Sequence, residues 1–518
     1  MARVLYAPLA VLLLALALAG CGDGTYTIVT LEARPAVADV RTVEISLANA
    51  NATQSETFVI DGRSFPLTFS IDTGGRAGEL EIAVDGKDGG GELVAHGAAR
   101  TAIVADGGGA ATVMLEPTDF LVNTSFVGDQ ALAFRFDAGG RQIALSSTGV
   151  ATIGWSDSCQ VVGRCDVFGR RFDATGRPVI TALAAGPGEF LFNRSDVTGF
   201  EPSLATNAAG HTVAVWSSGA DLLAVVVDAD GEALTGTETV IATGTSPSTP
   251  AVVAVPDGRF IVTWTERAPT AGQYRVQARY LSADGAPAIN PVNLGDTAFT
   301  LSTTIMTESN PPAAAWLGDG LALVVAWRTG TTIRGRFYTS GGVARAAADQ
   351  VLASRPTAEL IGEPQVAHLA GDAALLYPRA TTGGDADDGQ LVLRRLTTAG
   401  LVVGTDAVVT DGVARTPAAL TGAGGTLAAA WTACDAAGDG DGCGIRVRRF
   451  DASLAPLEAA RIANSITAGN QQEPSIALLP DGALIVAWSD GSTTPPDRDG
   501  FGIRARIVYP AVASGSSR

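Results

Sequence analysis

Aspartates crowd the segment CDAAGDGDGCG, which spans residues 434–444 and carries Asp435, Asp439 and Asp441 between two cysteines. Calcium prefers several carboxylate oxygens on a glycine-rich loop, so these three aspartates are candidate calcium ligands. The glutamate that ends an EF-hand loop is missing, and Asp and Gly are also the usual residues of solvated hairpin turns. The sequence leaves both interpretations open, and it indicates no other cofactor.

Related acidic loops occur in two other places, PDRDGFG with Asp497 and Asp499, and the run from 385 to 388. Catalytic spacings are not found: the chain contains no HExxH, GxSxG, P-loop or CxxC pattern. The S-x-D-x-G-x-x-W box of sialidase-like propellers is also missing. Glycoside hydrolysis needs two carboxylates at a defined separation, which a sequence alone cannot place.

The chain begins MARVLYAPLAVLLLALALAGC, a basic residue followed by a short apolar run. The run is too short to span a bilayer and is typical of a secretory signal. Its end, Leu18-Ala19-Gly20-Cys21, resembles the lipobox of bacterial lipoproteins. The resemblance implies cleavage after residue 20, acylation of Cys21, a tether over 21–24 and, because Gly22 follows the cysteine, an outer-membrane destination. Two or more acyl chains make such an anchor stable.

Four further cysteines are present: Cys159, Cys165, Cys434 and Cys443. An exported chain reaches an oxidising compartment, so we expect disulfides, and local spacing suggests 159 with 165 and 434 with 443. Zinc is a weaker interpretation because the three histidines lie far from these cysteines.

A repeat organises the remainder of the chain. Aromatic anchors recur 48 to 63 residues apart, and a proline precedes six of them by 13 to 15 residues. The anchors are Trp155, Trp216, Trp264, Trp327, Tyr377, Trp431 and Trp488. Trp316 is the one tryptophan outside this column. A period near fifty residues with strand-like contents favours propeller blades over helical solenoids.

Each repeat contains four expected strands. A short apolar strand leads through a turn such as Pro480-Asp481-Gly482 into a second strand, ALIVAW, with almost no polar residue. Such a strand is covered on both faces, as stacked blades would cover it. A third strand alternates arginine with apolar residues, and a more polar fourth strand forms the outer edge. We therefore interpret the anchor aromatics as core residues.

The two ends of the array suggest how it closes. The last repeat stops at Pro510 after its third strand, while DFLVNTS (119–125) stands ahead of the first repeat. DFLVNTS matches EFLFNRS (189–195), a fourth strand, so we expect it to complete the last blade. Seven blades are predicted for residues 119–510, with six or eight as alternatives, and a disordered tail over 511–518.

The motifs GRRFDATGRP, DFLVNTS, QEPSIALLPDGALIVAWSD and GFGIRARI resemble a bacterial secreted repeat family that forms propeller-like arrays. The likeness covers residues 119–510 and implies a fold, not a ligand. Residues 25–117 lack the repeat and contain seven short strand-like runs, which predict an antiparallel β-sandwich. This part resembles the immunoglobulin-like or carboxypeptidase-regulatory-like modules of surface lipoproteins.

Composition limits the function. The chain has 518 residues and a net charge of −18, and Lys87 is its sole lysine, so no basic stripe is available for nucleic acid. The leading hypothesis is a non-enzymatic envelope scaffold, anchored to the membrane at Cys21, that binds a protein or polysaccharide. The alternatives are a glycosidase or lyase with carboxylates at the propeller axis, and a structural envelope protein.

Overall fold

The protein is all-β in the computed structural model. The structure describes residues 26–50, 52–73, 76–104, 109–126, 128–132, 141–157, 165–181, 183, 188–194, 198–234, 238–291, 294–317, 322–339, 341–355, 359–381, 388–410, 412–434 and 438–511. Nowhere in these ranges does a helix have the length and apolar character needed to cross a membrane. The chain folds into two compact units, residues 1–119 (unit 1) and 120–518 (unit 2).

Within its described residues, unit 1 has one hydrogen-bonded sheet with the strand order β3-β2-β5-β6-β7-β1-β4. Its strands are β1 (Tyr26–Ala33), β2 (Thr42–Asn49), β3 (Ala52–Val59), β4 (Leu67–Asp72), β5 (Gly78–Lys87), β6 (Leu93–Ile103) and β7 (Gly109–Pro117). The seven predicted strands are therefore present. The predicted sandwich of two stacked sheets is not confirmed, because these strands belong to a single sheet.

The burial pattern explains how a single sheet forms a core. Buried and exposed residues alternate along β1 and β5, as expected where one face of a sheet is covered. The buried face includes Val29, Leu31, Val84, Val113 and Leu115, all with no exposed surface. Strand β6 meets β7 through two residue pairs, whereas β7 pairs with β1 in parallel over seven residues. The parallel pairing joins the first and last strands of the unit and closes its core.

The described residues of unit 2 form thirty strands in six hydrogen-bonded sheets. The first three sheets contain β9 (Gln130–Ala131) to β21 (Phe299–Thr300), with β10 (Ile143–Leu145), β11 (Ala151–Asp157), β12 (Val167–Phe172), β13 (Phe190–Leu191), β14 (Phe200–Thr206), β15 (Thr212–Ser218), β16 (Asp221–Val227), β17 (Thr239–Thr243), β18 (Ser248–Ala254), β19 (Phe260–Arg267) and β20 (Tyr274–Leu281) between them. A fourth sheet contains β22 (Ala313–Leu317), β23 (Ala322–Thr329), β24 (Thr332–Tyr338) and β25 (Gln350–Ser354).

A nine-stranded sheet holds the next two repeats, because β29 pairs with β31 at two residues. Its strands are β26 (Glu359–Ile361), β27 (Gln365–Leu369), β28 (Asp372–Thr381), β29 (Asp388–Leu396), β30 (Val402–Val408), β31 (Ala414–Ala423), β32 (Thr426–Cys434), β33 (Cys443–Phe450) and β34 (Arg461–Ile462). We call β31–β34 the sixth repeat. The last sheet contains β35 (Gln471–Leu478), β36 (Leu484–Asp490), β37 (Gly502–Val508) and β8 (Phe120–Leu121), and we call it the last repeat.

The anchor aromatics are core residues, as the sequence predicted. All seven lie on the second strand of their repeats with at most 2% of their surface exposed. The second strand of the last repeat is buried at every position, so both its faces are covered. Tyr377 replaces tryptophan in β28, and its hydroxyl donates a hydrogen bond to Asp406 Oδ2 over 3.2 Å. The tyrosine therefore fills the same core position and adds one polar contact at its rim.

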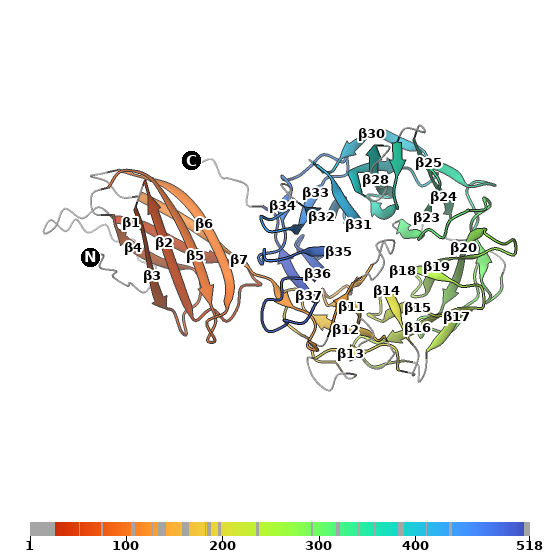
Figure 1. The fold of residues 1–518 in the computed structure, drawn as a ribbon, viewed down its shortest axis with the longest axis horizontal. Helices are drawn as coiled ribbons and strands as arrows, with labels where there is room; N and C mark the ends of the chain where they lie inside the picture. The colour runs from red at the N-terminus through yellow and green to blue at the C-terminus, as the bar shows by residue number, and fades with distance from the viewer. Residues whose placement is uncertain are drawn as a thin grey trace, which may run out of the picture. The chain divides into compact units, whose positions relative to one another are not determined.

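The strand pairing expected between the two ends of the array is confirmed. Leu121 lies opposite Arg504 and Phe120 opposite Ala505 in an antiparallel pair. The Val122 amide also donates to the Ile503 carbonyl over 2.8 Å. Within unit 2 the sheets follow one another around a ring, and the blue strands of the last repeat come next to β11 of the first (Figure 1). The first strand of unit 2 thus covers the edge that β37 would otherwise expose.

Candidate functional site

The innermost strands of the seven repeats line one pocket of about 370 Å³. Each repeat contributes its first strand, β10, β14, β18, β22, β27, β31 or β35, and the contributions come mainly from the second half of the strand. We call this cavity the axial pocket. Most of its lining is alanine, leucine, valine or isoleucine. The described residues that line it include no aspartate or glutamate, so the polar character comes from a few side chains, chiefly Arg141, Trp316 and His368.

Arg141 reaches across the axial pocket. It precedes β10 in the first repeat, where its carbonyl accepts a hydrogen bond of 2.7 Å from the Leu204 amide of the second repeat. Its guanidinium donates through Nη2 to the carbonyl of Val366, on β27 of the fifth repeat. One side chain thus connects opposite parts of the ring. Its sequence context, GGRQIALSS, contains no signal that distinguishes it from the other arginines, and sequence reasoning missed it.

The electrostatic surroundings of Arg141 are unusual for an arginine in this acidic chain. Burial lowers the pKa of Arg141 to about 10, and no carboxylate offsets that shift. The Arg141 side chain is surrounded by protein on most sides but keeps some exposed surface, which faces the pocket. The guanidinium stays protonated at neutral pH, since a pKa near 10 lies well above 7. It therefore carries a positive charge into a cavity whose described lining offers no negative one.

Trp316 lies on β22 and is the tryptophan that the repeat did not explain. It is partly exposed to the axial pocket, unlike the six anchor tryptophans, which are fully buried. His368 lies on β27, two residues after the carbonyl that Arg141 contacts, and its Nε2 accepts a hydrogen bond of 3.0 Å from the Gly371 amide. The pocket lining therefore combines the Arg141 cation, one large aromatic side chain and many small apolar side chains.

The candidate calcium ligands of the sixth repeat have protein partners. Asp439 Oδ2 accepts a hydrogen bond from Asn464 Nδ2, and its Oδ1 accepts one from the Asp441 amide over 3.3 Å. Asp441 Oδ2 accepts from the Gly469 amide over 3.4 Å. Asp435 lies outside the described residues. Among the residues that the structure describes, no group of three or more His, Cys, Asp or Glu side chains could hold a metal ion. The described geometry is that of a turn whose carboxylates are hydrogen-bonded to a neighbouring loop.

The acidic loop of the last repeat has the same geometry. Asp497 Oδ2 accepts from Asn123 Nδ2 over 2.9 Å, and its Oδ1 accepts from the Asp499 amide over 3.3 Å. Asp499 Oδ2 accepts from the Gly128 amide over 3.1 Å. The glycine that follows must stay glycine: Gly500 has a positive φ of 81°, and a Cβ there would lie 2.2 Å from Asp129 Oδ1. Both acidic loops are thus built to fit the connection that follows the fourth strand.

An asparagine at the end of the fourth strand organises these loops. The Ile503 amide donates to Asn123 Oδ1 over 2.8 Å, and the Ile445 amide donates to Asn464 Oδ1 over 2.9 Å. The first repeat has the equivalent pair, in which Asn193 Nδ2 donates to Asp166 over 2.9 Å. Sequence reasoning used these asparagines to align the fourth strands but did not assign the aspartates as their partners. The repeated Asn–Asp pair was the available signal.

The cysteines fall partly within the described residues. Cys434 and Cys443 form a disulfide, in agreement with their spacing, and they face each other at the ends of β32 and β33. Cys165 is also in a disulfide, but Cys159, its predicted partner, lies outside the described residues. Cys21, the predicted lipidation site, lies outside them as well.

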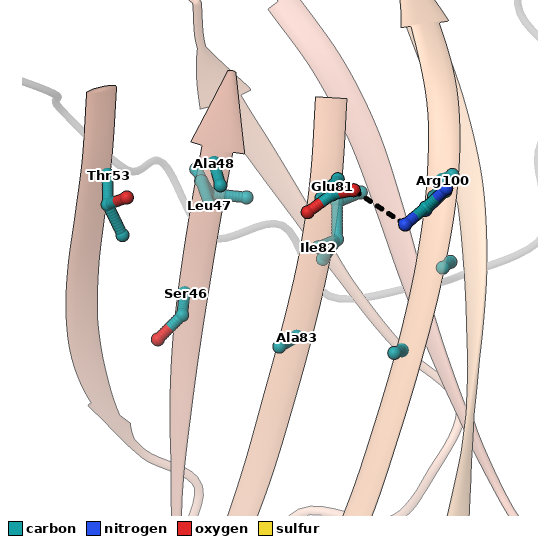
Figure 2. Close-up of a pocket in the computed structure, with 10 residues that line it drawn as sticks. Ser46, Leu47, Ala48, Thr53, Glu81, Ile82, Ala83 and Arg100 are labelled. Carbon is teal, nitrogen blue, oxygen red and sulfur yellow. Dashed lines mark ion pairs between the residues drawn. The ribbon is translucent and has the colours of Figure 1, made fainter. Parts of the chain in front are cut away.

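A second cavity, of about 390 Å³, occurs on the sheet of unit 1. Figure 2 shows its lining, in which small side chains such as Ala48, Ala83 and Ser46 leave a hollow between β3 and β6. Its charged residues are paired: Arg100 Nη2 lies 2.7 Å from Glu81 Oε1, and both side chains are more than half exposed. The ion pair leaves this hollow without the uncompensated charge that the axial pocket has.

No family model matches the sequence, and no curated protein matches it either. Among solved structures, the chain is similar to a protein of unknown function from Dyadobacter fermentans, with 12% identity, a TM-score of 0.40, and coverage of 76% of this chain and 98% of that one. It is similar to the NanB sialidase from Streptococcus pneumoniae at 10% identity and TM-score 0.40, covering 94% and 95%. It is also similar to the polysaccharide lyase Uly1 at 11% identity and TM-score 0.40, covering 71% and 90%. At these scores the likenesses carry no conclusion about activity.

Proposed function

We propose that the chain is a lipid-anchored protein of the bacterial outer membrane, whose second unit is a closed seven-bladed β-propeller that binds a polysaccharide or a protein. The lipobox-like sequence ending at Cys21 supports the anchor. The pairing of β8 with β37 and the seven similar repeats support the closed ring. In chain order unit 1 lies between the anchor and the ring, so we assign it the role of a spacer.

The observation that carries the binding function is the axial pocket. Seven strands from seven repeats converge on one cavity of about 370 Å³, a volume within the range of small-molecule sites. A ring of stacked sheets holds such a cavity rigidly, which lowers the entropy lost on binding. The glycosidase alternative needs two carboxylates beside the bound sugar, and none is found in the described lining. Binding is therefore the function that this geometry supports best.

The test uses the mature chain without its lipid, residues 22–518, on a glycan array and in pulldowns with envelope fractions. We expect saturable retention of one glycan class or one protein. Lack of retention on both platforms would contradict the binding proposal. Release of a shortened glycan during the array incubation would establish the enzyme alternative instead.

The anchor has a separate test. Cells that express the full chain are labelled with palmitate, and the wild type is compared with Cys21→Ala. We expect label in the wild-type protein and none in the variant. Equal labelling of both proteins, or labelling of neither, would overturn the lipidation proposal.

A further inference from the structure

The axial pocket presents one cation whose described surroundings leave most of its donors available. The Arg141 guanidinium has five N–H donors. Within the described residues, its side chain makes one hydrogen bond, to the carbonyl of Val366. Several other arginines of unit 2 have a carboxylate partner. Arg504, for example, lies 2.8 Å from Asp490. Arg141 therefore differs from them in having an uncompensated charge.

A buried charge without a counter-charge is costly, because burial removes the water that would solvate it. Burial lowers the pKa of Arg141, and no neighbouring carboxylate raises it again, as expected for such a charge. An anion that enters the pocket would supply the missing counter-charge. A carboxylate suits the site best, since the planar guanidinium donates two parallel hydrogen bonds to a carboxylate.

The remaining lining indicates what else such a ligand would contain. Trp316 offers an aromatic surface, and aromatic faces pack against the apolar face of a ring. Small residues such as Ala254, Ala367 and Ala477 also line the pocket and leave room for a ligand. The volume, about 370 Å³, suits one or two ring-sized groups rather than an extended chain.

We propose that the axial pocket binds the carboxylate of an acidic sugar, with Arg141 as the carboxylate-binding residue and Trp316 as the surface beneath the sugar ring. This inference rests on the proposed binding function and gives its ligand a chemical class. It also explains why a tryptophan outside the repeat is placed on an innermost strand. The alternative role for Arg141 is purely structural, as a connection between the first and fifth repeats.

The test is calorimetric titration of the lipid-free mature chain with D-glucuronate and, as a matched neutral sugar, D-glucose. We expect glucuronate to bind at least about tenfold more tightly than glucose, since a charge-assisted contact is lost with the carboxylate. Arg141→Gln should weaken glucuronate binding about tenfold to a hundredfold and leave glucose unchanged. Sodium sulfate, titrated in parallel, shows whether any anion suffices: binding as tight as that of glucuronate would remove the sugar from the proposal.

Arg100→Gln is the matched control, because it removes a cation from the hollow of unit 1. We expect it to bind glucuronate like the wild type, and loss of binding in this variant would move the site to unit 1. Trp316→Phe should keep the fold and weaken both sugars by a similar factor. If Arg141→Gln fails to fold, the comparison of glucuronate with glucose on the wild type and on Trp316→Phe still decides the proposal.

Thermal melting separates the ligand-binding role from the structural one. A ligand that binds the folded state raises Tm. Glucuronate at about ten times its dissociation constant for the wild type should therefore raise the wild-type Tm and leave that of Arg141→Gln unchanged. A lower Tm in Arg141→Gln with the same ligand-induced increase would assign Arg141 a structural role only. Retention of neutral glycans by both proteins on the array would leave the binding function standing and overturn this site assignment.

Discussion

The sixth and the last repeat contain the same acidic loop, but they hold it in different ways. In the sixth repeat, Asp439 is bonded to Asn464, 25 residues along the chain, and a disulfide joins the strands on either side. In the last repeat, Asp497 is bonded to Asn123, 374 residues away, and the strands are joined by the Asp490–Arg504 ion pair. One loop is completed locally, whereas the other requires the two ends of unit 2 to meet.

This difference shows which contacts belong to the repeat and which belong to closure. The Asn–Asp pair and the Asx turn are common to both loops, so they are repeat features. In the last repeat the same pair also joins β8 to the C-terminal strands, because Asn123 lies two residues after β8 and Asp497 lies between β36 and β37. Of these two repeats, only the last one therefore carries the entropic cost of bringing distant chain segments together.

The largest expected effect is on the ion pair of the last repeat. Arg504 Nε lies 2.8 Å from Asp490 Oδ2, and the two side chains are only 6% and 5% exposed. Arg504→Leu leaves a buried carboxylate without its cation and should lower the free energy of unfolding by about 3–5 kcal/mol. Urea denaturation, monitored by tryptophan fluorescence, measures this change in the free energy of unfolding.

Arg446→Leu is the matched variant, because Arg446 faces Trp431 in the sixth repeat as Arg504 faces Trp488. Arg446 is only partly buried and donates to the Gly438 carbonyl over 3.4 Å, so we expect a smaller loss, of about 1 kcal/mol. Equal losses in the two variants would remove this part of the comparison.

The next effect is on the two asparagines. Asn123→Ala and Asn464→Ala each leave a buried strand amide without its acceptor and an aspartate without its donor, Asp497 being buried and Asp439 partly buried. Either change should cost about 2–3 kcal/mol. Limited proteolysis distinguishes them: Asn123→Ala should expose residues 118–126 to cleavage, and Asn464→Ala should not. Identical digestion patterns would show that closure does not depend on Asn123.

The disulfide of the sixth repeat has an expected effect of similar size. Replacing both Cys434 and Cys443 by serine removes a cross-link across a sequence separation of 9 residues. Chain entropy predicts a loss of roughly 2–3 kcal/mol. The double variant is preferable to a reducing agent, because Cys165 is also in a disulfide. An unchanged urea midpoint would mean that the loop needs no cross-link, as in the last repeat.

Calcium should have the smallest effect. The described carboxylates of both loops already accept hydrogen bonds from the protein, so we expect Tm to change by less than about 1 °C between 5 mM calcium and excess EDTA. A clear rise with calcium in the wild type that Asp441→Asn abolishes would restore the calcium interpretation of the sixth repeat.

Sequence patterns were informative wherever structure repeats locally. The anchor tryptophans, the proline-led first strands and the DFLVNTS strand indicated the four-stranded repeats and the pairing of Phe120 with the C-terminal strand. In unit 1 the strands were predictable, but their single sheet was not, because the parallel pairing of β1 with β7 joins segments some eighty residues apart and has no local signature. Hydrophobic alternation reports that one face is buried, not which strand lies alongside.

The candidate site was less predictable than the fold. Asp439 and Asp497 lie in glycine-rich acidic segments, which resemble metal-binding loops in sequence. In the structure, however, each accepts a hydrogen bond from an asparagine that follows a fourth strand. Arg141 has an ordinary sequence context and gains its character from the convergence of seven strands around it. The axial pocket is formed by the first strands of all seven repeats, so it could be located only after the fold was known.

Native-state hydrogen exchange of the mature chain tests most directly whether the first strand of unit 2 closes the ring. The Val122 amide donates to Ile503 in the last repeat. We expect this amide to be as strongly protected as those of β36 and to lose its protection in Asn123→Ala. Exchange of Val122 at the rate of an unstructured peptide, while β36 remains protected, would contradict closure of the ring by this strand.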